Sequence, residues 1–235
     1  DSVLIIVDPQ ADSMHSPAFV PNRLSEGVFA DGNSITSGVT RGTDWLNRGN
    51  EVISHEIGHN LGLPDLYYTD AISLQETHRS IGNFGIMGNI ATVEPLMGNE
   101  MLAWHRWLLG WIDDSQASCF TGFPSWLPIR LSPIANGTGT VIGIVPLSDT
   151  EMIVVENRRK IGYDQNLLEE GVLVYTVDTQ IYSGQEPIVA QGPFTGDWPD
   201  SSILLQPDDT ISVNGYDITV TSEVGIDFFV EITPG

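Results

Sequence analysis

The chain has 235 residues and a formal net charge of −22, with 31 acidic residues against 9 basic ones. This acidic excess argues against binding to nucleic acid or to an anionic membrane through a basic face, and it favours high solubility. The single cysteine, Cys119, excludes an intrachain disulfide, and no apolar run is long enough to span a bilayer.

Strands are the first elements expected. Residues 3–8 are a short apolar run ended by Asp8-Pro9, which predicts a buried strand. A possible edge strand is expected near 34–40, within a stretch rich in Ser, Asn, Gly and Pro. Because the chain starts at Asp1 with an immediate strand and no initiator methionine, we expect it to be a processed or excised mature region rather than a complete gene product.

A helix is predicted from Asn50, which can cap it, to Gly62. Positions four apart lie on one helical face, so His55 and His59 can offer imidazole nitrogens to one metal ion. Glu56 lies beside them, where its carboxylate can accept a proton from a metal-bound water. This stretch therefore predicts a hydrolytic zinc site.

The residues after the second histidine predict where a third ligand lies. Gly62 can take the left-handed conformation that ends helices, and Pro64 prevents the helix from resuming. The chain is then free to fold back and present Asp65 to the same metal. Catalytic zinc sites use three protein ligands and leave a fourth position to water. We predict His55, His59 and Asp65 as the ligands.

Later segments supply supporting elements. Residues 82–88 predict a glycine-rich tight turn, and a second helix is expected over about 99–109, ended by Gly110. Beyond Asp113-Asp114, short β-type runs separated by Asn, Asp, Gly and Pro are typical of an antiparallel β module. These runs are 140–147, 150–156, 171–177, 202–206, 216–221 and 226–232. We predict a catalytic domain over 1–112 and a β-sandwich-like module over 113–235.

The order of these motifs resembles known peptidases. The spacing from His55 to Asp65 resembles the metzincin signature, with aspartate in place of the usual third histidine, and 82–88 resembles the metzincin methionine turn. The later segments 103–111, 155–158, 162–164 and 171–178 follow in the order of the secreted bacterial immune inhibitor A metallopeptidases. The resemblance runs from about residue 50 to residue 180, over half of the chain.

The resemblance implies an α+β fold for the chain. The expected catalytic part is zincin-like or metzincin-like, with a small sheet, the active-site helix, a methionine turn and a second helix. A C-terminal antiparallel β-rich module is expected to pack on it. The implied activity is that of a secreted, extracellular zinc metalloendopeptidase. One catalytic Zn²⁺, protein or peptide substrates and a monomeric state are expected.

The expected mechanism uses the metal and Glu56 together. Zinc lowers the pKa of its bound water and polarises the scissile carbonyl, while Glu56 accepts the water proton and passes it to the leaving amine. Substrate is expected to pair with the edge strand near 34–40. Some metzincin families place a tyrosine two residues after the methionine, but position 89 is asparagine. The residue that stabilises the oxyanion therefore stays open among Tyr67, Tyr68, His78 and His105.

Acidic loops also suggest structural Ca²⁺, which takes oxygen ligands. The candidate places are residues 65–70, Asp197 with Asp200, and Asp208 with Asp209. None carries the EF-hand pattern, so a solvated acidic surface is the alternative at each of them.

Two further interpretations of the zinc motif stay open. In a gluzincin arrangement, a downstream glutamate such as Glu76, Glu94 or Glu100 would be the third ligand. In a different class, the chain would be a non-catalytic acidic β-rich binding or adhesion module with a structural zinc site. Glu56 argues against that second class, because a structural site has no use for a general base.

Overall fold

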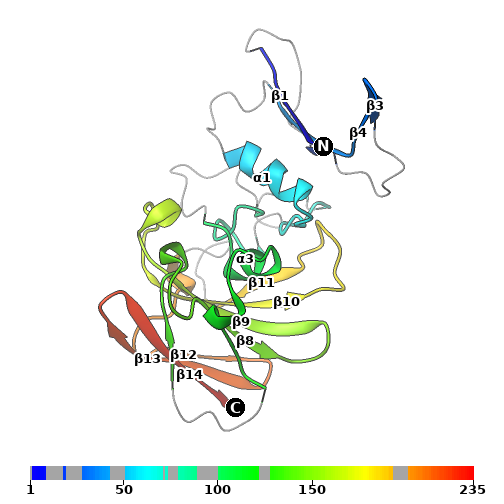
Figure 1. The fold of residues 1–235 in the computed structure, drawn as a ribbon. Coiled ribbons are helices and arrows are strands. Elements are labelled where there is room, and N and C mark those ends of the chain that lie inside the picture. Colours follow the sequence, from blue (N-terminus) through cyan, green and yellow to red (C-terminus); the bar gives the residue numbers. More distant parts are fainter. Residues whose placement is uncertain are drawn as a thin grey trace. The chain divides into compact units, whose positions relative to one another are not determined.

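The structure is a computed structural model, and it describes residues 2–8, 18–19, 28–42, 51–70, 72–73, 79–88, 100–121, 128–192 and 201–235 (Figure 1). The described chain divides into two compact units between Pro64 and Asp65. The domain boundary predicted between residues 112 and 113 lies within the second unit and stays a prediction. No helix among these residues is long and apolar enough to cross a membrane.

The first unit contains a small sheet of order β1-β5-β2, a hairpin and one helix. Strand β1 (Ser2–Ile6) pairs in parallel with β5 (Ser37–Arg41), and β2 (Ala18–Phe19) pairs antiparallel on the other side of β5. The hairpin joins β3 (Val28–Ala30) to β4 (Asn33–Ile35). Helix α1 (Glu51–Asn60) is the predicted helix, and it packs against β5 and β2 of this sheet.

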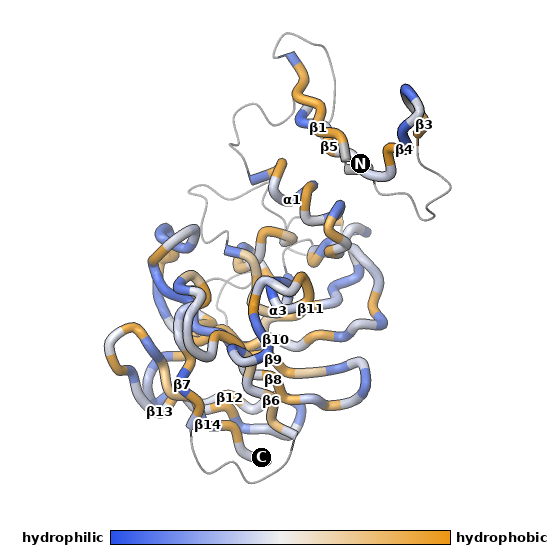
Figure 2. Tube along the Cα trace, in the orientation of Figure 1, coloured by the Kyte–Doolittle hydropathy of each residue, from blue (hydrophilic) through white to orange (hydrophobic). Residues whose placement is uncertain are grey.

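Two sequence predictions about these strands are wrong. The run 3–8 does form a strand, but it is not buried: Leu4 is 50% exposed and Ile6 65% exposed, and Figure 2 shows β1 as an apolar segment. The stretch 34–40 is not one edge strand either, because it is split between β4 and β5. β5 is the central strand of its sheet, paired with β1 along its length and with β2 at Gly38 and Val39, so it is not an edge strand.

The second unit contains two larger sheets. Their strand orders are β11-β10-β9-β8-β6 and β12-β13-β14-β7, and most neighbours run antiparallel, with β6 and β8 parallel. The strands of the first sheet are β6 (Ala117–Cys119), β8 (Ile142–Pro146), β9 (Glu151–Arg158), β10 (Gly171–Asp178) and β11 (Ile188–Gln191). Those of the second are β7 (Ile129–Leu131), β12 (Thr210–Val213), β13 (Tyr216–Val224) and β14 (Asp227–Pro234).

An apolar core lies between these sheets. Val155 and Val174 of one sheet belong to the same buried cluster as Val220 and Phe228 of the other. Alternate side chains of a strand point to opposite faces, and Ile153 with Val155 of β9 shows this spacing in the core. The second unit is therefore a β-sandwich.

Most runs predicted as strands after residue 113 are strands, and one is not. Residues 202–206 begin with a 3-10 helix, η6 (Ser201–Ile203), followed by an isolated bridge between Leu205 and Val172. The other described 3-10 helices are η3 (Asp114–Gln116), η4 (Ile134–Asn136) and η5 (Gly162–Asp164). The short strands β6, β7, β11 and β12 were not predicted, because they are too short to show a clear alternation.

The predicted α+β zincin-like or metzincin-like fold class is wrong. Strands hold 40% of the structure and helices 16%, and the described residues contain two α-helices, α1 and α3 (Ala103–Leu108). The motif on α1 specifies one short helix, whereas alternating runs rich in β-branched residues specify the longer strands of the second unit. A largely β protein follows from the second pattern.

Helix α3 is capped by side chains from the first large sheet rather than by its own N-cap residue, Leu102. The N–H of Ala103 donates to Glu156 Oε2 at 2.7 Å, and the N–H of Trp104 donates to the Tyr175 hydroxyl at 3.2 Å. The Tyr175 hydroxyl in turn donates to Glu156 Oε2 at 2.7 Å. A carboxylate at a helix N-terminus satisfies free N–H groups and the helix dipole together.

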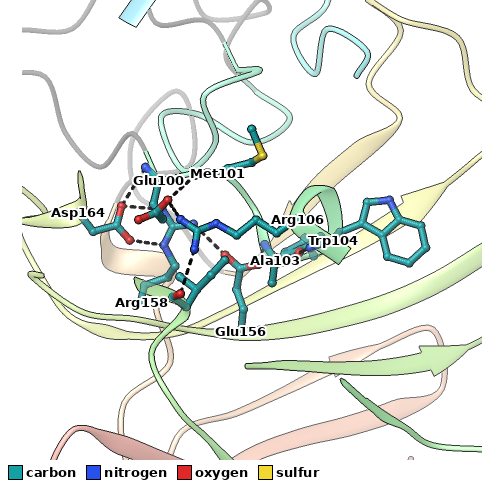
Figure 3. A network of polar contacts seen from close by, with 10 residues as sticks. Glu100, Met101, Ala103, Trp104, Arg106, Glu156, Arg158 and Asp164 are labelled. Carbon is teal, nitrogen blue, oxygen red and sulfur yellow. Dashed lines mark hydrogen bonds and ion pairs between the residues drawn. The ribbon is translucent and has the colours of Figure 1, made fainter. Parts of the chain in front are cut away.

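Arg158 joins this cap to a second carboxylate inside the sandwich unit. Its guanidinium donates to Glu156 at 2.8 Å and to both oxygens of Asp164 at 2.6 and 2.8 Å (Figure 3). Burial alone would lower the pKa of Arg158, but Asp164 and Glu156 outweigh it and raise that pKa above its ordinary value. Burial, together with Glu156, raises the pKa of Tyr175 well above 10. The hydrogen bonds and ion pairs of this network connect α3, β9, β10 and η5.

Candidate metal site

The predicted histidine pair lies on α1 with its rings together. His55 is buried and His59 half-buried, and their ring centroids are 4.8 Å apart with the planes nearly perpendicular, at 88°. Residues at i and i+4 of a helix are neighbours on one face, so the local fold alone produces this pairing.

The end of α1 has the Schellman form that the glycine predicts. Gly62 has φ +92°, its N–H donates to the His59 carbonyl at 2.9 Å, and the Leu63 N–H donates to the Gly58 carbonyl at 3.0 Å. The chain therefore reverses at Gly62. It brings the main chain of Leu63 back toward the last turn of the helix.

This reversal brings the Leu63 carbonyl within hydrogen-bonding distance of His59. His59 Nδ1 lies 2.9 Å from the Leu63 carbonyl oxygen. Because a carbonyl only accepts, the proton of the neutral imidazole belongs on Nδ1 and the lone pair on Nε2. A metal-binding histidine generally donates its other ring N–H in this way, which fixes both tautomer and ring orientation.

Asp65 completes the group. One ligand atom from each of His55, His59 and Asp65 lies within 4.8 Å of the others. Donors of a tetrahedral zinc lie about 3.3 Å apart, so these three atoms would have to move closer together to hold the ion. Two imidazoles and a carboxylate fit zinc.

The predicted glycine-rich turn supports the residue that follows Asp65. The Leu66 N–H donates to the Met87 carbonyl at 3.0 Å, and Met87 is fully buried. Gly88 has no room for a side chain, since a Cβ there would lie 2.6 Å from the Gly82 carbonyl oxygen. The tight turn is thus confirmed, whereas a place for its methionine beneath the metal stays a prediction.

Glu56 is half-buried on α1, directly after His55. Its role as the general base stays a prediction. The donor set and this neighbouring carboxylate give the two parts that water activation needs, which are a metal position and a proton acceptor.

The oxyanion candidates are only partly described, and His78 lies outside the described residues. His105 is 1% exposed on α3, and burial lowers its pKa to about 4, so it is a neutral core histidine. Tyr67 and Tyr68 are half-buried, and Tyr68 carries the Arg79 guanidinium 4.8 Å above its ring. Asn89 is also outside the described residues.

The alternative third ligands receive no support. Glu100 is buried and occupied by an ion pair with Arg106 and a hydrogen bond from the Met101 N–H at 3.1 Å. Glu76 and Glu94 lie outside the described residues. Within the described ranges, the group with metal-binding geometry is His55, His59 and Asp65.

The calcium prediction is not tested. Asp209 accepts the Gln206 N–H at 2.8 Å and Asp208 has φ +74°, so this pair shapes a turn before β12. Asp197 and Asp200 lie outside the described residues. Calcium therefore stays a prediction.

Two contacts of the site were missed from the sequence. The contact between the Leu63 carbonyl and His59 could have been predicted, because a helix that ends at Gly62 returns its main chain to the last turn. Ser183, whose hydroxyl accepts the Asp65 N–H at 2.8 Å, was not, because it is 118 residues away along the chain.

No protein-family model, curated protein or solved structure matches this chain. The case for a function therefore rests on the chemistry of the site itself.

Proposed function

We propose that this protein is a zinc-dependent endopeptidase. The observation that carries the proposal is the 2.9 Å contact between His59 Nδ1 and the Leu63 carbonyl, within a group that also contains His55 and Asp65. It leaves Nε2 of His59 as a lone-pair donor, the state that a zinc ligand requires.

The residues have separate tasks in this proposal. His55, His59 and Asp65 hold the ion, and a bound zinc supplies an acidic water and a Lewis acid for the substrate carbonyl. The Glu56 carboxylate accepts a proton from that water. It then returns the proton to the amine nitrogen as the peptide bond breaks.

Asp65 sets the balance between these tasks. Its negative charge would make a bound metal a weaker Lewis acid than a third neutral histidine would. Activation of the water therefore depends more strongly on Glu56, and loss of that carboxylate has a correspondingly severe effect.

The proposed setting is extracellular, with proteins or peptides as substrates. The net charge of −22 suits a soluble protein that avoids nucleic acid and anionic membranes. Similarity to the immune inhibitor A peptidases in the run from His55 to Asp65 is part of the same proposal. A non-catalytic binding module with a structural zinc is the alternative, and the β-sandwich of the second unit favours it.

Cleavage of casein by the purified chain tests the proposal. We expect activity that a chelator abolishes and zinc restores. Glu56→Gln should retain zinc and lose nearly all turnover. Glu51→Gln is the matched control, because it makes the same change more than one turn away on α1, and it should remain active. A chain that binds one zinc but cleaves nothing would support the binding module instead.

A further inference from the structure

The loop between β10 and β11 reaches back to the proposed ligand Asp65. The Ser183 hydroxyl accepts the Asp65 N–H at 2.8 Å, and it lies 3.4 Å from Asp65 Oδ2, to which it donates. The second contact is longer than an ordinary O–H···O bond, so the main-chain bond sets the position of the hydroxyl. With that bond accepted, the hydroxyl has its proton left to donate, and the carboxylate is the acceptor beside it.

Main-chain pairing holds the serine in place. The Gly184 N–H donates to the Asp65 carbonyl at 3.0 Å, and the Thr69 N–H donates to the Gly184 carbonyl at 2.9 Å. Tyr68 and Gln185 form an antiparallel bridge in the same contact. The loop therefore forms a short main-chain pairing with residues 65–69. Ser183 lies next to Asp65 in this pairing.

Two further features make this pairing specific. Gly184 has φ +76°, and a Cβ there would lie 2.5 Å from Thr69 Cγ2, so only glycine fits. Beyond it, Arg79 donates to both oxygens of Glu186 at 2.6 Å each. A bidentate pair fixes direction as well as distance, so the loop is anchored on the far side of Ser183 too.

We propose that Ser183 is a positioning residue for the metal ligand Asp65. Its hydroxyl accepts the main-chain N–H of that residue and lies beside Oδ2, and in this proposal the contact favours binding of the metal through the other oxygen, Oδ1. This inference rests on the proposed zinc site. Groups that orient a ligand in this way contribute about 10-fold to 100-fold to metal affinity.

Zinc affinity of the metal-free protein, measured by competition with a chromophoric chelator, tests the proposal. We expect Ser183→Ala to weaken zinc binding by about 10-fold. Ser183→Thr, which keeps the hydroxyl, should restore most of the affinity. The matched control is Thr69→Val, which removes the other hydroxyl of this pairing, bound to the Gly184 carbonyl at 3.2 Å, and should leave the affinity unchanged.

The outcomes separate this inference from the proposed function. Wild-type affinity in Ser183→Ala, or an equal loss in Thr69→Val, overturns the positioning role while the zinc site stands. A wild-type chain that binds no zinc overturns both. Urea unfolding of the metal-free variants is followed in parallel, and a loss of affinity that merely tracks a loss of folded protein also overturns the positioning role.

Discussion

The imidazole Nδ1 of His59 and the carbonyl oxygen of Leu63 lie 2.9 Å apart, across the C-terminal end of α1. This contact exists because Gly62 ends the helix in a left-handed conformation and turns the chain back. The glycine thus acts on the histidine through the main chain. It favours the tautomer that carries the proton on Nδ1 and the lone pair on Nε2, which is the form that binds a metal through Nε2.

Replacing Gly62 with alanine should therefore affect both stability and zinc binding. A Cβ at this position meets nothing within 4 Å, so the cost is that of the left-handed backbone, about 1–2 kcal/mol. Any relaxation of φ moves the Leu63 carbonyl away from His59, and we expect zinc affinity to fall. Urea unfolding and chelator competition measure the two effects.

Gly215→Ala is the matched control for that change. Gly215 has φ +82° and equally open space, but it lies in the two-residue turn between β12 and β13. We expect a similar loss of stability with unchanged zinc affinity. Equal zinc affinity in Gly62→Ala and wild type would show that the helix end does not orient His59.

The buried Glu156 should be far more important for stability than an exposed glutamate of the same strand. Glu156→Gln removes one of two carboxylates from the fully buried Arg158 and weakens the cap of α3, so we expect a loss of about 3 kcal/mol. Glu151→Gln, an exposed position at the other end of β9, should change stability by about 0.5 kcal/mol or less. Chemical denaturation of both variants decides this, and equal losses would contradict the structural role of the network.

His105 should make the metal-free protein sensitive to mild acid. Its pKa is about 4 when folded and about 6.5 when exposed, so the unfolded state binds a proton that the folded state refuses. The associated stability is fully present above pH 6.5 and is lost as the pH falls toward 4. Over that window the loss is about 3 kcal/mol.

Comparison with His105→Gln isolates this titration. Unfolding free energies of both proteins are measured at several pH values between 7 and 4 in the presence of a chelator. The wild type should lose stability more steeply than the variant below pH 6.5. Parallel pH profiles would show that His105 does not stay neutral in the fold.

Sequence patterns predicted the local structure around the candidate metal site well. The spacing of His55 and His59, the left-handed Gly62 and the break at Pro64 all act over a few residues, and the structure brings the two histidines and Asp65 together. Such short-range constraints are written directly into the sequence.

The global fold was predicted wrongly because short-range patterns do not determine it. A motif of a few residues was extended by resemblance to a whole α+β domain, although it fixes only one short helix. The alternating runs after residue 113 carried the correct information about strands, but the pairing of β9 with β10 and the stacking of the two sheets depend on contacts distant in sequence.

The buried network shows the same limit. Glu156 and Arg158 lie on β9, Asp164 on η5 and Tyr175 on β10, and the pattern of no single segment gave them a role. The fold brings these three segments together near the N-terminus of α3. A buried charge cluster of this kind has no local signature, because its members meet only after the sheet has formed.

X-ray absorption at the zinc edge of the zinc-loaded protein tests the central claim most directly. We expect one zinc per chain with two imidazole ligands, oxygen donors and no sulfur, and the loss of one imidazole in His59→Ala. A first shell with fewer than two imidazoles in the wild type, or an unchanged spectrum in His59→Ala, would contradict a zinc site at His55, His59 and Asp65.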